Sequence, residues 1–156
     1  MTTFIGIDPG TRDNTGIAVL RKSSIETATY TLGDDTPASA ILADMGIMPD
    51  EECIVGIETQ YMARGAKCNP ATVIKLAHQA GRWLECAAMM EWHAVLVAPR
   101  SWQTQTVGIN ARSGRADVAR ETKVWAGKVA GRLLPEDEAA ALAIAMWAKH
   151  NWASAE

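Results

Sequence analysis

The sequence has few cysteines and no apolar run long enough to cross a membrane. Its three cysteines, Cys53, Cys68 and Cys86, include no C-x-x-C pair, so we expect neither a zinc ribbon nor a disulfide framework. A reducing compartment is the usual setting for such a chain. The longest apolar run, Ala139 to Ala148, is shorter than a membrane span, and residues 1–4 do not begin a signal peptide. We therefore expect a soluble, cytoplasmic protein with no membrane contact.

What is present is the composition of one globular domain. Of the 156 residues, 48% are hydrophobic and 21% are charged, which excludes collagen-like, disordered and disulfide-dense chains. No internal repeat or low-complexity tract occurs. The chain is long enough to bury a core and too short for two large lobes, so we expect a single domain over residues 1–156.

The charge changes sign along the chain. Residues 1–60 hold three Lys or Arg and ten Asp or Glu, residues 61–134 hold eleven and four, and residues 135–156 hold one and four. Because counterion release depends on local contacts and not on net charge, the basic middle segment can bind phosphates even on an acidic protein. The alternative is that its Lys and Arg lie on the solvent faces of two helices. The charge pattern by itself favours neither interpretation.

Apolar runs bounded by turn residues predict a sheet of five strands. The run at 53–57 is flanked by acidic residues, which is typical of a central strand covered on both faces. The first two runs are separated by Pro9-Gly10 and form a hairpin. The expected strands span residues 4–8, 15–20, 25–32, 53–57 and 94–98.

Helix-start signals predict four helices between and after these strands. Asn69 before Pro70 is a good N-cap followed by a proline at the first helical position. Ser113 is expected to cap the next helix, and Pro135 to open the last one. The order of elements, β-β-β-α-β-α-β-α-α, predicts an α/β domain with a mixed central sheet and helices on both faces. The expected helices span residues 38–45, 70–90 and 115–133, and the last begins at Pro135.

Three acidic residues lie at the ends of elements that belong to the predicted core. Asp8 ends the first strand, Glu58 follows the strand at 53–57, and Asp137 lies in the first turn of the last helix. If the two strands are neighbours, Asp8 and Glu58 emerge at the same edge of the sheet, and the helix start closes the third side. Each acid alone also has a structural explanation: turn chemistry for Asp8, a solvated strand end for Glu58 and the helix dipole for Asp137.

Together the three carboxylates indicate a specific chemistry. Two carboxylates about 4 Å apart repel by roughly 4 kcal/mol at an effective dielectric of about 20, and a divalent cation removes that repulsion. Ligation by carboxylate oxygens suits Mg²⁺ or Mn²⁺, which also bind substrate phosphate. Two such ions can activate a water and stabilise the departing oxygen of a phosphodiester. Asp8, Glu58 and Asp137 are therefore the candidate catalytic and metal-binding residues of a phosphodiester hydrolase.

Several short motifs also occur in an order that resembles one nuclease family. Over residues 4–148 the ordered set is similar to the RuvC-type Holliday junction resolvases, especially their phage-type members. The resemblance implies an RNase H-like fold, a homodimer and magnesium-dependent cutting of four-way DNA junctions, in the bacterial cytoplasm if a phage encodes the chain. The motifs are Ile5-Gly6-Ile7-Asp8-Pro9-Gly10-Thr11, Thr15-Gly16-Ile17-Ala18-Val19, Ile57-Glu58-Thr59-Gln60-Tyr61-Met62-Ala63, Ala98-Pro99-Arg100-Ser101-Trp102, Thr106-Val107-Gly108 and Asp137-Glu138-Ala139-Ala140-Ala141-Leu142-Ala143-Ile144-Ala145.

The resemblance implies roles for single residues. Asp8, Glu58 and Asp137 match the metal ligands. Tyr61 falls where the family has an aromatic side chain that stacks on bases near the junction centre, an interaction worth about 1–3 kcal/mol per base. Arg115 falls where the family has a lysine near the scissile phosphate. The alternatives are a loop aromatic folded over the core and a solvated helix arginine. The expected DNA-binding residues are Tyr61, Arg64, Lys67, Arg112 and Arg115.

The chain departs from the family pattern at two further positions. Ala140 occupies the place of the second acid of the last motif, and Gln103 replaces a lysine. Glu136 lies one turn before Ala140 on nearly the same helical face, whereas Glu138 points about 100° away from Asp137. The sequence assigns the missing role to neither glutamate. The alternative to an endonuclease is therefore a protein that binds branched DNA without cutting it.

Two other families share the opening motif. The hairpin over residues 5–19 resembles the phosphate-binding hairpin of actin-like ATPases and sugar kinases. Those proteins need two lobes and a second phosphate loop, for which 156 residues leave no room, so no nucleotide cofactor is expected. Nucleases of ribosomal RNA precursors also share the opening motif, but the segment 99–102 and the loop around Tyr61 favour the junction enzymes.

Overall fold

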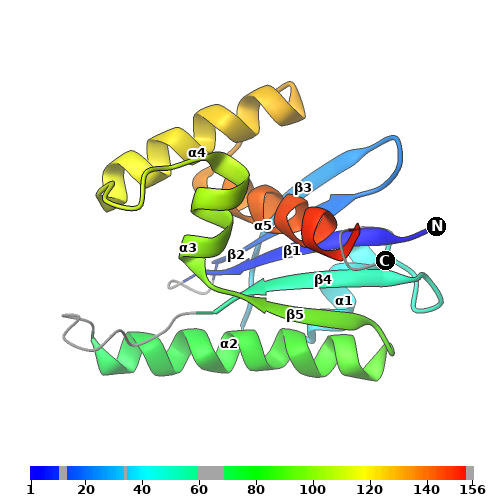
Figure 1. Cartoon of the computed structure of the whole chain (residues 1–156). Coiled ribbons are helices and arrows are strands. Elements are labelled where there is room, and N and C mark those ends of the chain that lie inside the picture. The colour runs from blue at the N-terminus through cyan, green and yellow to red at the C-terminus, as the bar shows by residue number, and fades with distance from the viewer. Residues whose placement is uncertain (11–13, 34, 60–68, 154–156) are drawn as a thin grey trace.

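A five-stranded sheet runs through the centre of the molecule (Figure 1). This computed structural model describes residues 1–10, 14–33, 35–59 and 69–153. The strands are β1 (Thr3–Pro9), β2 (Asn14–Leu20), β3 (Ile25–Thr31), β4 (Cys53–Glu58) and β5 (His93–Val97). Their order is β3-β2-β1-β4-β5, in which the first three are antiparallel neighbours and β4 and β5 are parallel to β1. The predicted mixed sheet of five strands, with the strand at 53–57 inside it, is confirmed.

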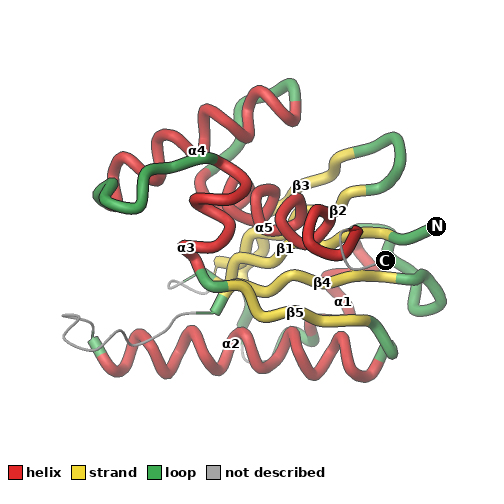
Figure 2. Tube along the Cα trace, viewed as in Figure 1, coloured by secondary structure: helices red, strands yellow, loops and turns green. Residues whose placement is uncertain are grey.

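The helices cover both faces of this sheet (Figure 2). Asn69 caps α2 as predicted, because its side chain accepts a hydrogen bond of 3.0 Å from the backbone N–H of Ala71. Among the described residues, no helix has the length and apolar character needed to cross a bilayer. The elements are α1 (Ala38–Asp44), α2 (Pro70–Met89), α3 (Pro99–Trp102), the π-helical turn η1 (Gln103–Val107), α4 (Arg115–Ala130) and α5 (Glu136–Ala153).

Two sequence-based expectations about the helices were wrong. The N-cap of α4 is Gly114 and makes no side-chain hydrogen bond, so Ser113 does not cap it. The same helix ends at Ala130 and not at residue 133, because Gly131 adopts a left-handed conformation with φ of 70°. In addition, α3 and η1 follow Pro99 directly, where no helix was expected. Pro99 begins α3 because a proline fits the first helical position, where no N–H is needed.

The two faces of the sheet are packed with different side chains. On one face, α1 and α2 cover large aliphatic residues of β1 and β4, including Ile5 and Val55, around the buried Trp83. On the other face, α5 lies against Ala18 of β2 and contributes Leu142. Large side chains fill the first face, whereas small side chains on the second face allow the helix and strand backbones to approach closely.

Glycines make this close approach possible. A Cβ atom added at Gly6 would lie closer than 3.0 Å to the carbonyl oxygen of Ala141, and one added at Gly16 would lie equally close to that of Asp137. Both contacts are with backbone atoms, which cannot move aside as a flexible side chain can. The two glycines therefore fix where α5 crosses the sheet, and Gly16 fixes the position of its first turn.

Candidate functional site

Asp8 and Glu58 lie side by side at one edge of the sheet. The strands β1 and β4 are parallel, and Ile7 pairs with Ile57, so the next residue of each strand reaches the same edge. Both carboxylates lie at the carboxyl ends of their strands, where α/β sheets commonly bind ligands. The sequence made this placement conditional on the two strands being neighbours, and they are.

The start of α5 brings Asp137 to the same edge. Gly16 pairs with Asp8 across the β1–β2 ladder, and a Cβ atom on Gly16 would lie 3.0 Å from the Cβ of Asp137. Asp137 is therefore above the strand pair that carries Asp8. Three acids that are far apart in the sequence therefore lie at the same end of the sheet.

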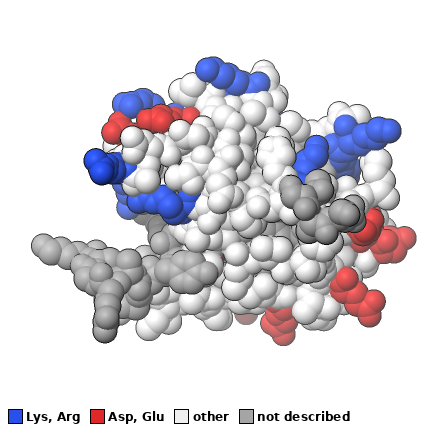
Figure 3. All heavy atoms as spheres, viewed as in Figure 1, with Lys and Arg blue, Asp and Glu red and all other residues white. Residues whose placement is uncertain are grey.

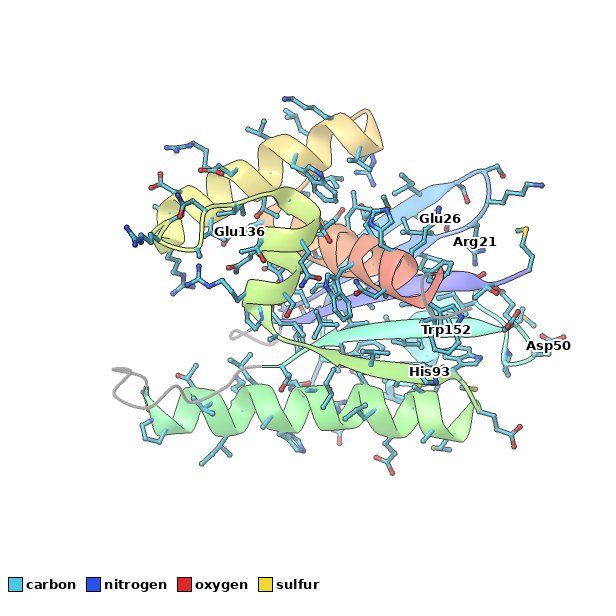
Figure 4. The ribbon with its side chains drawn as sticks, viewed as in Figure 1. Arg21, Glu26, Asp50, His93, Glu136 and Trp152 are labelled. Atoms are coloured by element: carbon cyan, nitrogen blue, oxygen red, sulfur yellow. The ribbon has the colours of Figure 1, made fainter. Side chains whose placement is uncertain are left out.

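The three acids line one cleft with a volume of about 520 Å³. Residues of α2, α3 and α4 form its other sides, among them Thr72, Arg100 and Arg115. Glu136, the first residue of α5, also lines it. Figure 4 shows Glu136 between the ribbons of α3 and α4, at the end of the molecule opposite to Arg21, Glu26 and Asp50.

The acids of the cleft repel one another. Burial raises the pKa of Asp8 well above its ordinary value, and the nearby charges of Glu58, Asp137 and Glu136 raise it further. Burial also raises the pKa of Asp137, with smaller contributions from Glu136 and Glu138. Both shifts report a site that favours bound positive charge, because a cation near the carboxylates would stabilise their ionised forms.

Trp102 holds Glu58 in place. Its indole N–H donates a hydrogen bond of 2.6 Å to Oε2 of Glu58, and the tryptophan is only 4% exposed. A short bond between a buried donor and a carboxylate fixes the direction of the acid. The sequence motif around Pro99 contained Trp102 but gave it no role, since only the turn of α3 brings it to β4.

The position of the missing acid is also in the cleft. Ala140 lines it and is 7% exposed, one helical turn after Glu136. Glu138 points away from the cleft, because its carboxylate accepts a hydrogen bond from the hydroxyl of Thr27 and lies 4.0 Å from Arg132. Of the two glutamates that flank Asp137, only Glu136 therefore lines the same cleft as the three acids.

The predicted DNA-binding residues have different placements. Arg115, the first residue of α4, lines the cleft, and Arg112 is exposed on the loop before it. Arg100, which the sequence analysis did not select, lines the cleft from α3 and is exposed. In Figure 3, Lys and Arg side chains gather on the side of the molecule that carries α3 and the start of α4. Three predicted residues, Tyr61, Arg64 and Lys67, lie outside the described residues.

The carboxylate oxygens that line the cleft are donor atoms of the type that Mg²⁺ prefers. In the described part of the chain, no three His, Cys, Asp or Glu side chains are arranged to hold an ion by themselves. Mg²⁺ usually takes only one or two carboxylates and keeps waters and substrate phosphates as its other ligands. The cleft also contains the hydroxyl of Thr122, which is buried and has no hydrogen-bond partner among the described residues. Such a hydroxyl can donate or accept a hydrogen bond.

Fold and cleft together define an α/β domain of the RNase H-like class, with an acidic site at the carboxyl ends of two parallel strands. The sequence matches no protein-family model and no curated protein. Solved structures with a similar fold include two of RuvC. RuvC of T. thermophilus in complex with a Holliday junction substrate is similar with a TM-score of 0.65 and 18% identity, over 99% of this chain and 96% of that chain. The structure described as Thermus thermophilus RuvC is similar with a TM-score of 0.62 and 18% identity, over 98% of this chain and 96% of that chain.

Proposed function

We propose that the protein is a crossover junction endodeoxyribonuclease, which uses Mg²⁺ or Mn²⁺ to cut phosphodiester bonds in four-way or branched DNA. The observation that carries the proposal is the cleft that gathers Asp8, Glu58 and Asp137 beside exposed arginines. The fold adds support, because a structure with the same fold is a RuvC bound to a Holliday junction. Acidic oxygens and arginines in one cleft are the groups that phosphodiester cleavage requires.

The residues of the cleft would divide the work between metal and phosphate. Asp8, Glu58 and Asp137 would hold the metal together with waters and substrate phosphate, and the metal would supply activation of a water and stabilisation of the departing oxygen. Trp102 keeps Glu58 directed into the cleft. Arg115 would bind a phosphate of the DNA backbone, because a guanidinium can donate two parallel hydrogen bonds to phosphate oxygens.

The remaining parts of the proposal concern the DNA and the assembly. A four-way junction has two-fold symmetry, so cutting it symmetrically takes two active sites and therefore a homodimer. Arg112 would contact backbone phosphates next to the cleft, and Tyr61, Arg64 and Lys67 keep the DNA-binding roles that the resemblance gives them. Membership of the phage-type subgroup and a cytoplasmic location stay predictions.

Cleavage of a synthetic four-way junction tests this function. We expect the protein to cut the junction in the presence of Mg²⁺ or Mn²⁺ and to leave a linear duplex of the same sequence intact. Asp8→Asn, which keeps the shape of the side chain, should abolish cutting and retain junction binding. Cutting without a divalent ion, or equal cutting by Asp8→Asn, would contradict the proposal.

Ala140 supports a second candidate function, a branched-DNA-binding protein without turnover. The alanine lines the cleft where the resemblance places an acid. Comparing the protein that carries Ala140 with its Ala140→Asp variant decides between the two functions. Cutting by Ala140→Asp alone would indicate a disabled enzyme, whereas tight junction binding without cutting in both would indicate the binding protein. Equal cutting by both would show that position 140 needs no acid.

A further inference from the structure

We propose that Glu136 provides the fourth carboxylate of the cleft, in place of the acid that is missing at position 140. This inference rests on the proposed metal-dependent function and names a residue that the family pattern does not select. In this account the site keeps four carboxylates, and the one that is missing at position 140 is supplied from position 136.

Helical geometry favours Glu136 for this role. Residues four apart on a helix lie on the same face, one turn above the other, so Glu136 lies above Ala140 on the face of α5 that lines the cleft. The methyl group of Ala140 leaves space where a longer acid would extend. A glutamate also has one more methylene than an aspartate, which suits a ligand that starts one turn further away.

The neighbouring glutamate is excluded by its own contacts. Glu138 accepts a hydrogen bond from Thr27, and its Oε2 lies 4.0 Å from Nη1 of Arg132. Its side chain is 12% exposed and faces β3. Glu136, in contrast, is exposed and lines the cleft, and its charge acts on Asp8 as well as on Asp137, whereas the charge of Glu138 raises the pKa of Asp137 alone of these two acids. Only Glu136 can therefore contribute a carboxylate to the cleft without first breaking existing bonds.

A separate observation points to a ligand in this part of the cleft. Thr122 on α4 is 2% exposed, and its hydroxyl has no partner within the described ranges. It lines the same cleft as Glu136 and Ala140. A buried hydroxyl without a partner costs stability, and the waters of a hydrated divalent ion would provide the missing hydrogen bond.

Binding of Mn²⁺ to the full-length protein, measured by calorimetry and by electron paramagnetic resonance, tests the inference without relying on cleavage. We expect Glu136→Gln to weaken Mn²⁺ binding by about tenfold or more. Glu138→Gln is the matched control from the same helical turn and should change the affinity less than about twofold. Adding Ala140→Asp to Glu136→Gln should restore most of the lost affinity, since the acid then returns by the other route.

The outcomes separate this inference from the proposed function. If Asp8→Asn abolishes Mn²⁺ binding but Glu136→Gln behaves like Glu138→Gln, the metal site stands and the role of Glu136 is overturned. If neither the protein that carries Ala140 nor the variant with Ala140→Asp binds Mn²⁺, the metal-dependent function itself is wrong. Thermal unfolding of each variant shows that a loss of affinity does not come from a loss of fold.

Discussion

The two ends of the central sheet differ in the partners of their acidic side chains. The carboxylates at one end form salt bridges and hydrogen bonds, whereas those at the other end lie near one another. At the end where β2 leads into β3, Arg21 binds Glu26 at 2.7 Å and lies 3.9 Å from Glu51. The hydroxyl of Thr3 donates to Glu51 as well. At the other end, Asp8 faces Glu58 and further acids, and no salt bridge to Asp8 or Asp137 occurs among the described residues.

This difference teaches where the molecule is built for stability and where it is built for binding. Paired carboxylates cost little, whereas half-buried carboxylates that repel one another destabilise the folded state. A fold keeps such an arrangement where a ligand offsets it, and strongly shifted pKa values accordingly cluster at functional sites. The cleft end is therefore the part of the sheet where negative charge accumulates, and the proposed divalent cation would offset that charge.

The largest expected loss of stability comes from a substitution that displaces α5, and with it Asp137, from the cleft end of the sheet. Gly16→Val places a side chain against the backbone of Asp137, so α5 cannot lie at its present height on the sheet. We expect the free energy of unfolding to fall by about 4 kcal/mol or more, enough to unfold a marginal domain. Thermal or urea unfolding measures this loss.

Gly81→Ala is the control for Gly16. Gly81 lies within α2, and an added Cβ meets no atom within 4 Å, so the substitution should raise stability by roughly 0.5–1 kcal/mol through helix propensity. If Gly16→Val were tolerated as well as Gly81→Ala, the close contact between α5 and β2 would not hold Asp137 at the cleft.

A smaller effect is expected where Trp102 bonds to Glu58. Trp102→Phe keeps an aromatic ring but removes the N–H that donates to the carboxylate, and a hydrogen bond to a charged group contributes about 1.5–3 kcal/mol. Trp147→Phe is the matched control, because its indole donates to the neutral side chain of Gln105 at 2.7 Å on the surface. We expect urea unfolding to show a clearly larger loss for Trp102→Phe. Equal losses would mean that the bond to Glu58 has no special strength.

Replacing Asp8 should have a smaller effect than replacing Trp102, and the effect should be stabilising, because the substitution removes a repelling charge. The folded-state pKa of Asp8 lies above its ordinary value of 3.8, so the folded protein binds this proton more tightly than the unfolded chain. Stability therefore falls as the pH rises from that ordinary value through the raised pKa. Asp8→Asn should remove this part of the fall and raise the melting temperature at neutral pH by a few degrees, since about 1 kcal/mol corresponds to roughly 2–4 °C in a domain of this size.

The paired end provides the contrast. Glu26→Gln breaks a surface salt bridge with Arg21, and such pairs contribute about 0–1 kcal/mol, so the melting temperature should fall slightly or stay unchanged. Melting curves between pH 4 and pH 8 measure both variants. A decrease in stability for Asp8→Asn at neutral pH would show that Asp8 has a stabilising partner and that the two ends do not differ as described.

Much of the fold was predictable because it depends on local patterns. The apolar runs gave all five strands, and Asn69 before Pro70 gave the start of α2. The closeness of Asp8 and Glu58 could be predicted on the condition that β1 and β4 are neighbours, since parallel strands bring their carboxyl ends together. The strand positions and the start of α2 follow from patterns within short segments, whereas the meeting of Asp8 and Glu58 also requires the long-range pairing of β1 with β4.

Other parts of the site depend on contacts that no short segment contains. The bond from Trp102 to Glu58 requires α3, which forms directly after β5 and continues into a π-helical turn that ends at Gly108 with φ of 80°. The unpartnered hydroxyl of Thr122 becomes visible only when α4 faces the cleft. Ser113 has the right chemistry for a cap, but the chain begins α4 one residue later.

Anomalous diffraction from crystals grown with MnCl₂ tests the central claim most directly. The account predicts a manganese peak at the carboxyl ends of β1 and β4, with carboxylate oxygens of Asp8 and Glu58 at about 2.0–2.3 Å, the range for hard cations with oxygen ligands. Crystals of Asp8→Asn should lack this peak. A fully occupied manganese ion at another place, with the cleft empty at millimolar concentration, would contradict the account.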